Sequence, residues 1–146
     1  MAAIKSKSKL KTPYQDNGRA TFKIRKRPGC YIIYKNDVVR YVGFSGVDVY
    51  KALYRHFQTW NDKRQQRVTY ERLAGIKVRV IYTNTAGQAS KLEKALIIKL
   101  KPADNIQQYW INYDVDASEQ KIYDNYINEP SSDIVSTWHN GDNLPF

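Results

Sequence analysis

Two stretches rich in β-forming residues stand close together in the first third of the chain. Residues 31–34 and 38–43 consist mainly of tyrosine, isoleucine and valine, the side chains enriched in strands. The pair Asn36-Asp37 lies between them, and both residues favour tight turns. The pattern predicts an antiparallel hairpin.

The apolar residues then change from alternation to a helical period. Asp48 is placed as an N-cap, and apolar residues recur behind it at intervals of three and four: Tyr50, Leu53, Tyr54 and Phe57. We therefore expect a helix here. Residues 61–72 are polar and basic, and we expect a loop with a short helix in that stretch.

A strand and a second long helix complete the predicted core. Alternate residues of 76–82 are apolar, which is typical of a half-buried strand. From Thr85 or Gly87 the helical period returns, with one apolar side made of Ala89, Leu92, Leu96 and Leu100, and Pro102 ends it. The order β-β-α-β-α predicts a small α+β domain with a central three-stranded antiparallel sheet flanked by helices.

Charge divides the 146-residue chain into three parts. Residues 1–27 hold nine Lys/Arg and one Asp, a net +8, and we interpret them as a basic N-terminal arm. Residues 28–111 hold fourteen Lys/Arg and six acids, also +8, and form the predicted domain. Residues 112–146 hold one Lys and seven acids, a net −6; we expect an acidic extension packed on or beside the domain, with a third helix beginning near Asp116.

The overall charge of +10 favours a polyanionic partner, nucleic acid before an anionic membrane. The sequence contains no apolar run long enough for a transmembrane helix, and its first residues do not resemble a secretory signal. The single cysteine, Cys30, excludes an internal disulfide and a zinc ribbon. We expect a cytoplasmic protein, nucleoid-associated if it is cellular, with no membrane partner.

Three short motifs carry a family resemblance. The hairpin contains Gly29-Cys30-Tyr31 and Tyr41-Val42-Gly43, with the tyrosines ten positions apart. Glu93 is followed by the apolar pair Leu96-Ile97, then by Pro102, and twelve positions on by Asn105. Residues 53–57 form a basic segment after the hairpin.

In this order the motifs resemble the GIY-YIG nuclease family. The glutamate motif is similar to that of the excision-repair nuclease subunit, and residues 53–57 to the basic helix of phage homing nucleases. The resemblance covers residues 29–105 and makes residues 28–111 a nuclease-like domain. It departs from the family at Cys30, where isoleucine is usual, and at Ala52, which stands where the catalytic arginine is expected.

The resemblance implies a metal-dependent DNA endonuclease. Glu93 would hold one divalent cation, Mg²⁺ or Mn²⁺. Tyr31 would deprotonate or position the attacking water, and Tyr41 would hydrogen-bond the water or the phosphate. Arg55 would contact the scissile phosphate in place of the arginine missing at position 52. His56 would bind phosphate or orient Tyr31.

Two further residues would support the site, and a basic set would hold duplex or branched DNA. Asn105 would hydrogen-bond backbone to hold the glutamate helix, and Gly43 would allow a close approach or a tight bend. The expected nucleic-acid-binding residues are Lys35, Arg40, Lys63, Arg64, Arg67 and Arg72. The motifs do not choose between a monomer and a homodimer.

Plainer interpretations remain open for these residues. Tyr31 and Tyr41 could be core aromatics, Glu93 a solvated glutamate paired with a lysine, and the basic residues a solvated loop. At the level of function, the chain could be a catalytically weakened module that only binds nucleic acid, because of Ala52. On charge alone it could also be an RNA- or ribosome-associated protein.

Overall fold

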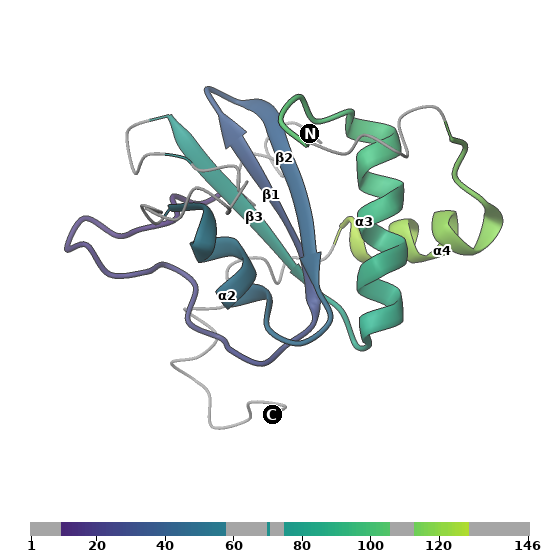
Figure 1. Ribbon diagram of the computed structural model, residues 1–146, viewed down its shortest axis with the longest axis horizontal. Coiled ribbons are helices and arrows are strands. Elements are labelled where there is room, and N and C mark those ends of the chain that lie inside the picture. The colour runs from purple at the N-terminus through teal and green to yellow at the C-terminus, as the bar shows by residue number, and fades with distance from the viewer. Residues whose placement is uncertain (1–9, 58–69, 71–74, 106–112, 129–146) are drawn as a thin grey trace, which may run out of the picture.

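A three-stranded antiparallel sheet forms the centre of the protein (Figure 1). The computed structural model describes residues 10–57, 70, 75–105 and 113–128. Strand β1 (Gly29–Lys35) lies in the middle, between the edge strands β2 (Val38–Ser45) and β3 (Ile76–Tyr82), and pairs antiparallel with both. The α+β fold expected from the sequence is confirmed.

The turn that joins β1 to β2 is the expected one. Asn36 and Asp37 have φ angles of 51° and 65°, so both lie in the left-handed region. Two consecutive residues of this kind give a turn whose twist matches that of the paired strands. Lys35 and Val38 therefore pair directly across the turn, and the register places Tyr31 opposite Gly43.

Side-chain caps fix the start of each helix. Asp48 accepts the Lys51 N–H at the start of α2 (Val49–Tyr54), which continues as the 3₁₀ turn η1 (Arg55–Phe57). Thr85 accepts the Gln88 N–H at the start of α3 (Ala86–Leu100). Asp116 and Glu119 form a reciprocal capping box at the start of α4 (Ala117–Tyr126).

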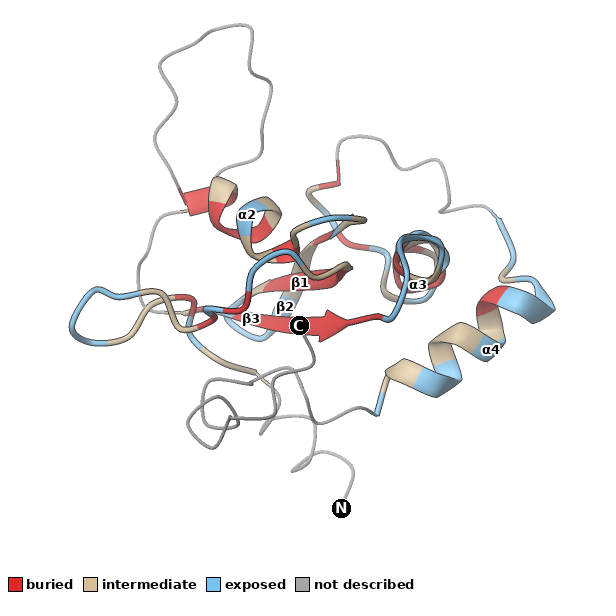
Figure 2. Ribbon diagram, turned by 90° about the horizontal axis from the view of Figure 1, so that it is seen from below, coloured by how far each residue is buried: buried red, intermediate tan, exposed pale blue. Residues whose placement is uncertain are grey.

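Helices α2 and α3 cover opposite faces of the sheet (Figure 1). Alternate residues of β1 point to opposite faces, so Tyr31 and Ile33 belong to the cluster under α2, whereas Cys30 and Ile32 pack under α3. Figure 2 shows the buried strands between the two helices, with α4 beside α3. Two small cores therefore share one sheet.

Part of the segment that the sequence assigned to a basic arm packs against this domain. Phe22 and Ile24 are each 1% exposed and belong to the α2-side core. Tyr54 of α2 accepts the Phe22 N–H and donates its hydroxyl to the Pro13 carbonyl. Residues 10–27 are thus held on the domain by side chains that turn inward between the basic ones.

Other expectations fall partly outside the described ranges. Of the predicted basic loop 61–72, the structure describes Tyr70 alone. The acidic extension is described over residues 113–128, where the expected third helix is present as α4. Within the described ranges, no helix combines the length and the apolar character needed to cross a membrane.

Candidate active site

A buried tyrosine–histidine pair lies between β1 and the end of α2. The Tyr31 hydroxyl and His56 Nε2 are 2.7 Å apart, and the two residues are 4% and 3% exposed. They are separated by 25 positions in the sequence and meet because η1 turns back over the sheet. A hydrogen bond between two titratable groups in such a desolvated place holds both side chains in one arrangement.

Gly43 makes room for this pair. A Cβ built on Gly43 would lie 2.4 Å from both Cζ and Oη of Tyr31, so any larger residue would displace the phenol. The φ angle of Gly43 is not among the positive ones, so the tight bend considered in the sequence is not its role. The glycine instead lets the phenol lie directly on the backbone of the edge strand β2.

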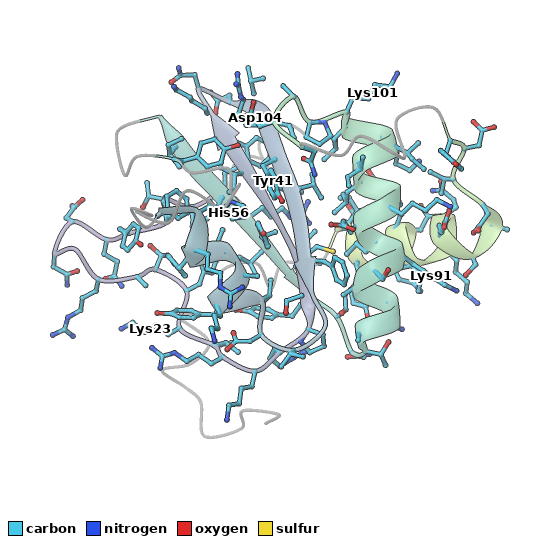
Figure 3. The ribbon with its side chains drawn as sticks, viewed as in Figure 1. Lys23, Tyr41, His56, Lys91, Lys101 and Asp104 are labelled. Carbon is cyan, nitrogen blue, oxygen red and sulfur yellow. The ribbon has the colours of Figure 1, made fainter. Side chains whose placement is uncertain are left out.

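Tyr41 is the third ring of the cluster. Its ring centroid is 4.5 Å from that of His56 and 6.1 Å from that of Tyr31, with which it is stacked. Figure 3 shows Tyr41 and His56 beside each other, with Asp104 above them in the view. The structure thus brings together three of the five residues expected to be catalytic.

Glu93 approaches from the other face of the sheet, on α3. It is partly buried, and desolvation raises the pKa of its carboxyl to about 7. Its neighbour Lys94 does not pair with it but forms a 2.8 Å ion pair with Glu119 of α4. Within the described residues no hydrogen bond or ion pair holds the Glu93 carboxyl, so its charge is left uncompensated by the chain.

The unusual Cys30 lies next to Glu93 and is a packing residue. Its thiol donates to the Ala89 carbonyl at 3.1 Å and is fully buried. Burial raises the pKa of the Cys30 thiol well above its ordinary value, and the nearby Glu93 charge adds to the effect. The thiol therefore stays protonated and joins β1 to α3. Cys30 pairs with Phe44 on β2, the residue that follows Gly43.

The segment after α3 is fastened to the edge strand β2. The Asn105 side chain accepts the Val42 N–H at 2.9 Å and donates to the Val42 carbonyl at 2.8 Å. The Asp104 N–H also donates to the Arg40 carbonyl. These three bonds replace the strand partner that an edge strand lacks on its outer side. They hold β2 and the end of α3 in a fixed relation.

Arg40, expected to bind nucleic acid, is committed to an ion pair. Its guanidinium contacts both carboxylate oxygens of Asp104, at 2.8 and 3.0 Å. This hydrogen-bonded contact lowers the pKa of Asp104. The Tyr70 hydroxyl donates to the same carboxylate at 2.8 Å, while the Tyr70 N–H donates to the His56 carbonyl. Asp104 is thus linked through Tyr70 to η1, which carries His56.

The sequence did not single out Asp104 or this contact of Tyr70. The only available signal was that Asp104 directly precedes Asn105 in the proline–asparagine motif. Its partners Arg40 and Tyr70 lie 64 and 34 positions away, and no local pattern reports pairs so distant.

The remaining candidates have different surroundings. Arg55 is half-buried in η1, next to His56, and Ala52 packs against the α2-side core one turn earlier. Lys35 is exposed at the end of β1. Four of the expected nucleic-acid-binding residues lie outside the described ranges: Lys63, Arg64, Arg67 and Arg72.

The described residues hold no group of three or more His, Cys, Asp or Glu that could bind a metal ion together. A metal near Glu93 would therefore have this one carboxylate as its protein ligand among the described residues. Such a donor set suits Mg²⁺, which keeps most of its water molecules and shares its remaining positions with substrate phosphates.

The paired tyrosines on a hairpin, the histidine behind them and the lone helix carboxylate define a nuclease-type domain. A sequence model of the GIY-YIG catalytic domain matches residues 27–110, more than half of the chain. The chain therefore belongs to the GIY-YIG family. No curated protein and no solved structure shows significant similarity to it. Membership implies a nuclease-type activity, the hydrolysis of phosphodiester bonds in nucleic acid.

Proposed function

We propose that this protein is a divalent-metal-dependent endonuclease that hydrolyses phosphodiester bonds of DNA. The observation that carries the proposal is the 2.7 Å contact between the Tyr31 hydroxyl and His56 Nε2. It joins one of the paired tyrosines that define the family to an imidazole, a side chain that can accept or donate a proton. A buried phenol with a purely packing role could instead donate to a backbone carbonyl, as Tyr54 does to Pro13.

The contact explains how a tyrosine could activate water. A free phenol titrates near 10, about three units above neutral pH, and is a poor base in its neutral form. With His56 Nε2 unprotonated, the imidazole accepts the hydroxyl hydrogen of Tyr31 while the phenol oxygen accepts a proton from the attacking water. One proton enters the pair from the water and one moves to His56, so no free phenolate has to accumulate.

Two other side chains would stabilise charge on the scissile phosphate. Arg55 follows α2 directly and is adjacent to His56 in η1. Its guanidinium can donate two hydrogen bonds to phosphate oxygens as negative charge develops there. Tyr41, whose ring lies 4.5 Å from that of His56, would donate its hydroxyl to the water or the phosphate.

Glu93 fits the role of cation ligand. Its carboxyl is desolvated, its pKa is raised to about 7, and no cationic side chain of the described residues pairs with it. A divalent cation would compensate this charge and return the carboxyl to its ionised form. When bound, the cation supplies positive charge beside the leaving 3′ oxygen.

In this proposal the two halves of the site, the Tyr31 phenol and the Glu93 carboxylate, adjoin the same edge strand, β2. The Tyr31 phenol reaches the strand at Gly43 from the α2 side. Glu93 stands beside Cys30, whose partner on the strand is Phe44, the next residue. A phosphate lying on this part of β2 would have the phenol on one side and the carboxylate on the other.

A second function is favoured by one observation, the alanine at position 52. Ala52 packs against the α2-side core and offers no charge to a phosphate. If Arg55 does not replace the missing arginine, the chain binds DNA without cutting it. Arg55→Ala separates the two cases, because a role at the phosphate requires cleavage to fall by about 10²-fold or more.

The proposal is tested by incubating the purified protein with supercoiled plasmid and Mg²⁺ or Mn²⁺. We expect nicking by the wild type and none by Glu93→Ala. Asp124→Ala, which removes an exposed carboxylate from α4, is the matched control and should cut like the wild type. Equal cleavage by Glu93→Ala and the wild type would indicate a contaminating nuclease and contradict the proposal. Tight binding without cleavage would support the second function.

A further inference from the structure

Residues 19–27, here called the basic strap, run beside α2 and carry five positive charges. The charged residues are Arg19, Lys23, Arg25, Lys26 and Arg27. No acid lies between Asp16 and Asp37 in the sequence, so the strap itself contains no negative charge. Four of the five are exposed, and Arg27 is half-buried. The strap precedes the hairpin and took no part in the site described above.

The strap is held in a fixed conformation because buried apolar residues alternate with exposed basic ones along it. Phe22 and Ile24 turn into the α2-side core, so Lys23 and Arg25 point outward between them. Backbone bonds secure both ends of the strap: the Thr21 N–H donates to Pro13, and Arg27 accepts the Val49 N–H at the start of α2. The outward charges therefore stand on a rigid support, which reduces the ordering cost of binding.

A further contact joins the strap to the helix of the candidate site. The Arg25 guanidinium lies 4.7 Å above the Tyr50 ring of α2, a cation–π geometry. The helix then runs directly into η1 with Arg55 and His56. In Figure 1 the strap runs from the left of α2 and beneath this helix to the start of β1. Within the described residues, Lys23, Arg25 and Lys26 form no ion pair with an acid.

We propose that the basic strap is a binding surface for the phosphate backbone of duplex DNA, beside the cleavage site. This inference rests on the nuclease function proposed above, because it assigns the substrate of that site a path along α2. A row of exposed cations at fixed positions matches a polyphosphate, and such contacts position a duplex without reading its sequence. An anionic membrane fits less well, because the large apolar residues that are exposed in the described part of the chain, Val38, Phe44, Val47 and Tyr113, all lie outside the strap.

The experiment compares two variants that lose the same charge on opposite sides of the protein. The strap variant is Lys23→Gln/Arg25→Gln/Lys26→Gln. The control is Lys91→Gln/Lys99→Gln/Lys121→Gln, whose lysines are exposed on α3 and α4. Figure 3 shows Lys23 and Lys91 on opposite sides of the molecule. Affinity for a labelled mixed-sequence DNA duplex is measured over a series of salt concentrations, without divalent cation, after thermal unfolding has shown that both variants fold.

Each lost phosphate contact reduces the slope of log affinity against log salt by about one. We expect the strap variant to lose about three from this slope and to bind about tenfold or more weakly near 0.1 M salt. The control should keep the wild-type slope. An unchanged slope in the strap variant, or equal losses in both variants, would overturn the proposal.

Two further outcomes separate this inference from the nuclease proposal. If the wild type nicks plasmid but the strap variant keeps its affinity and slope, only the strap assignment fails. If the wild type neither binds duplex DNA nor cuts it, and instead binds vesicles of anionic lipid through the strap, both proposals fail.

Discussion

The two faces of the sheet are built from different kinds of side chain. The face under α2 combines aliphatic residues with aromatic ones, and its tyrosines, which include Tyr31 and Tyr54, carry hydroxyl groups. The face under α3 is mainly aliphatic and includes Leu92, Leu96 and Ile97. A buried aliphatic side chain needs shape complementarity alone, whereas a buried phenol also needs a hydrogen-bond partner. The α2 face therefore fixes polar groups in space as a consequence of packing.

This difference indicates a division of labour. The α2 side holds the tyrosines and the histidine that could move protons, and the basic strap lies beside it. The α3 side is a scaffold that presents one desolvated carboxylate, Glu93. Arg79 on that side is also used for packing, since its guanidinium donates to the Ile127 carbonyl at the end of α4. If the division is correct, substitutions on the two faces should affect different quantities.

The largest effect is expected from Tyr31→Phe, which should lower the cleavage rate by about 10²–10⁴-fold. The change removes the one atom that could take a proton from water and leaves the ring in place. Plasmid nicking measures the rate, and duplex affinity should remain close to that of the wild type. Stability should fall by about 1–3 kcal/mol, because the buried hydrogen bond between the Tyr31 hydroxyl and His56 is lost.

Tyr54→Phe is the matched control for that prediction. It also removes a buried hydroxyl from the α2 face, one bonded to Phe22 and Pro13, and should cost comparable stability. Its cleavage rate per folded molecule should remain that of the wild type. If both phenylalanine variants lose cleavage equally, the α2 face contributes only packing. The assignment of proton transfer to this face would then be wrong.

Leu92→Ala should produce the opposite pattern. Leu92 is fully buried in the aliphatic core under α3, and truncation of such a leucine costs about 2–5 kcal/mol of unfolding free energy. Chemical denaturation measures this loss. At a temperature where the variant is folded, its nicking rate should stay within about twofold of the wild type, since no reacting group has moved. A rate loss as large as that of Tyr31→Phe would show that the α3 face is more than a scaffold.

The sequence predicted most of the fold because its signals are local. The Asn36-Asp37 turn and the caps Asp48 and Thr85 each act over four residues or fewer, and the alternation of 76–82 reports one face of a single strand. These patterns are imposed by backbone geometry and are visible without the partner elements. The same holds for the motif residues, since the paired tyrosines come from the hairpin itself.

The contacts of the site could not be predicted in the same way. The Arg40–Asp104 ion pair joins residues 64 positions apart, so the sequence indicated Arg40 as a nucleic-acid-binding cation and did not reveal its acidic partner. Phe22 and Ile24 were hidden by their basic neighbours, because two alternating apolar residues are too few to predict a core segment. Tertiary packing decides which charged side chains stay exposed, and the local sequence pattern does not reveal this packing.

A smaller effect, with a sign set by burial, is expected from Glu93→Gln. Burial raises the Glu93 pKa to about 7 from an ordinary value of 4.5, so the folded protein keeps a proton that the unfolded chain releases between these pH values. The metal-free wild type therefore loses stability as pH rises through this window. The variant has no such penalty and should be more stable by roughly 1–3 kcal/mol at pH ~8, with no difference near pH ~4.

Denaturation at the two pH values measures this difference, and added Mg²⁺ sharpens it. The cation should stabilise the wild type at neutral pH but not the glutamine variant, because a ligand that binds the folded state raises its stability. If the wild type and Glu93→Gln have equal unfolding free energies at both pH values, the Glu93 carboxylate is solvated and burial does not destabilise its charged form. The α3 face would then contribute nothing to the chemistry.

The smallest effect on stability is expected at Asp104, which contacts Arg40 of β2 and Tyr70. Asp104→Asn removes the charge that binds Arg40 and accepts from Tyr70. The pair is partly exposed, so the loss at neutral pH should be at most about 1 kcal/mol. Because Arg40 lowers the Asp104 pKa, this contribution is present above the ordinary carboxyl pKa and disappears as pH falls through the lowered value. The unfolding free energies of variant and wild type should therefore converge at strongly acidic pH. If the unfolding free energies still differ at strongly acidic pH, the difference comes from changed packing at this contact. The negative charge of Asp104 would then not be what stabilises the edge strand.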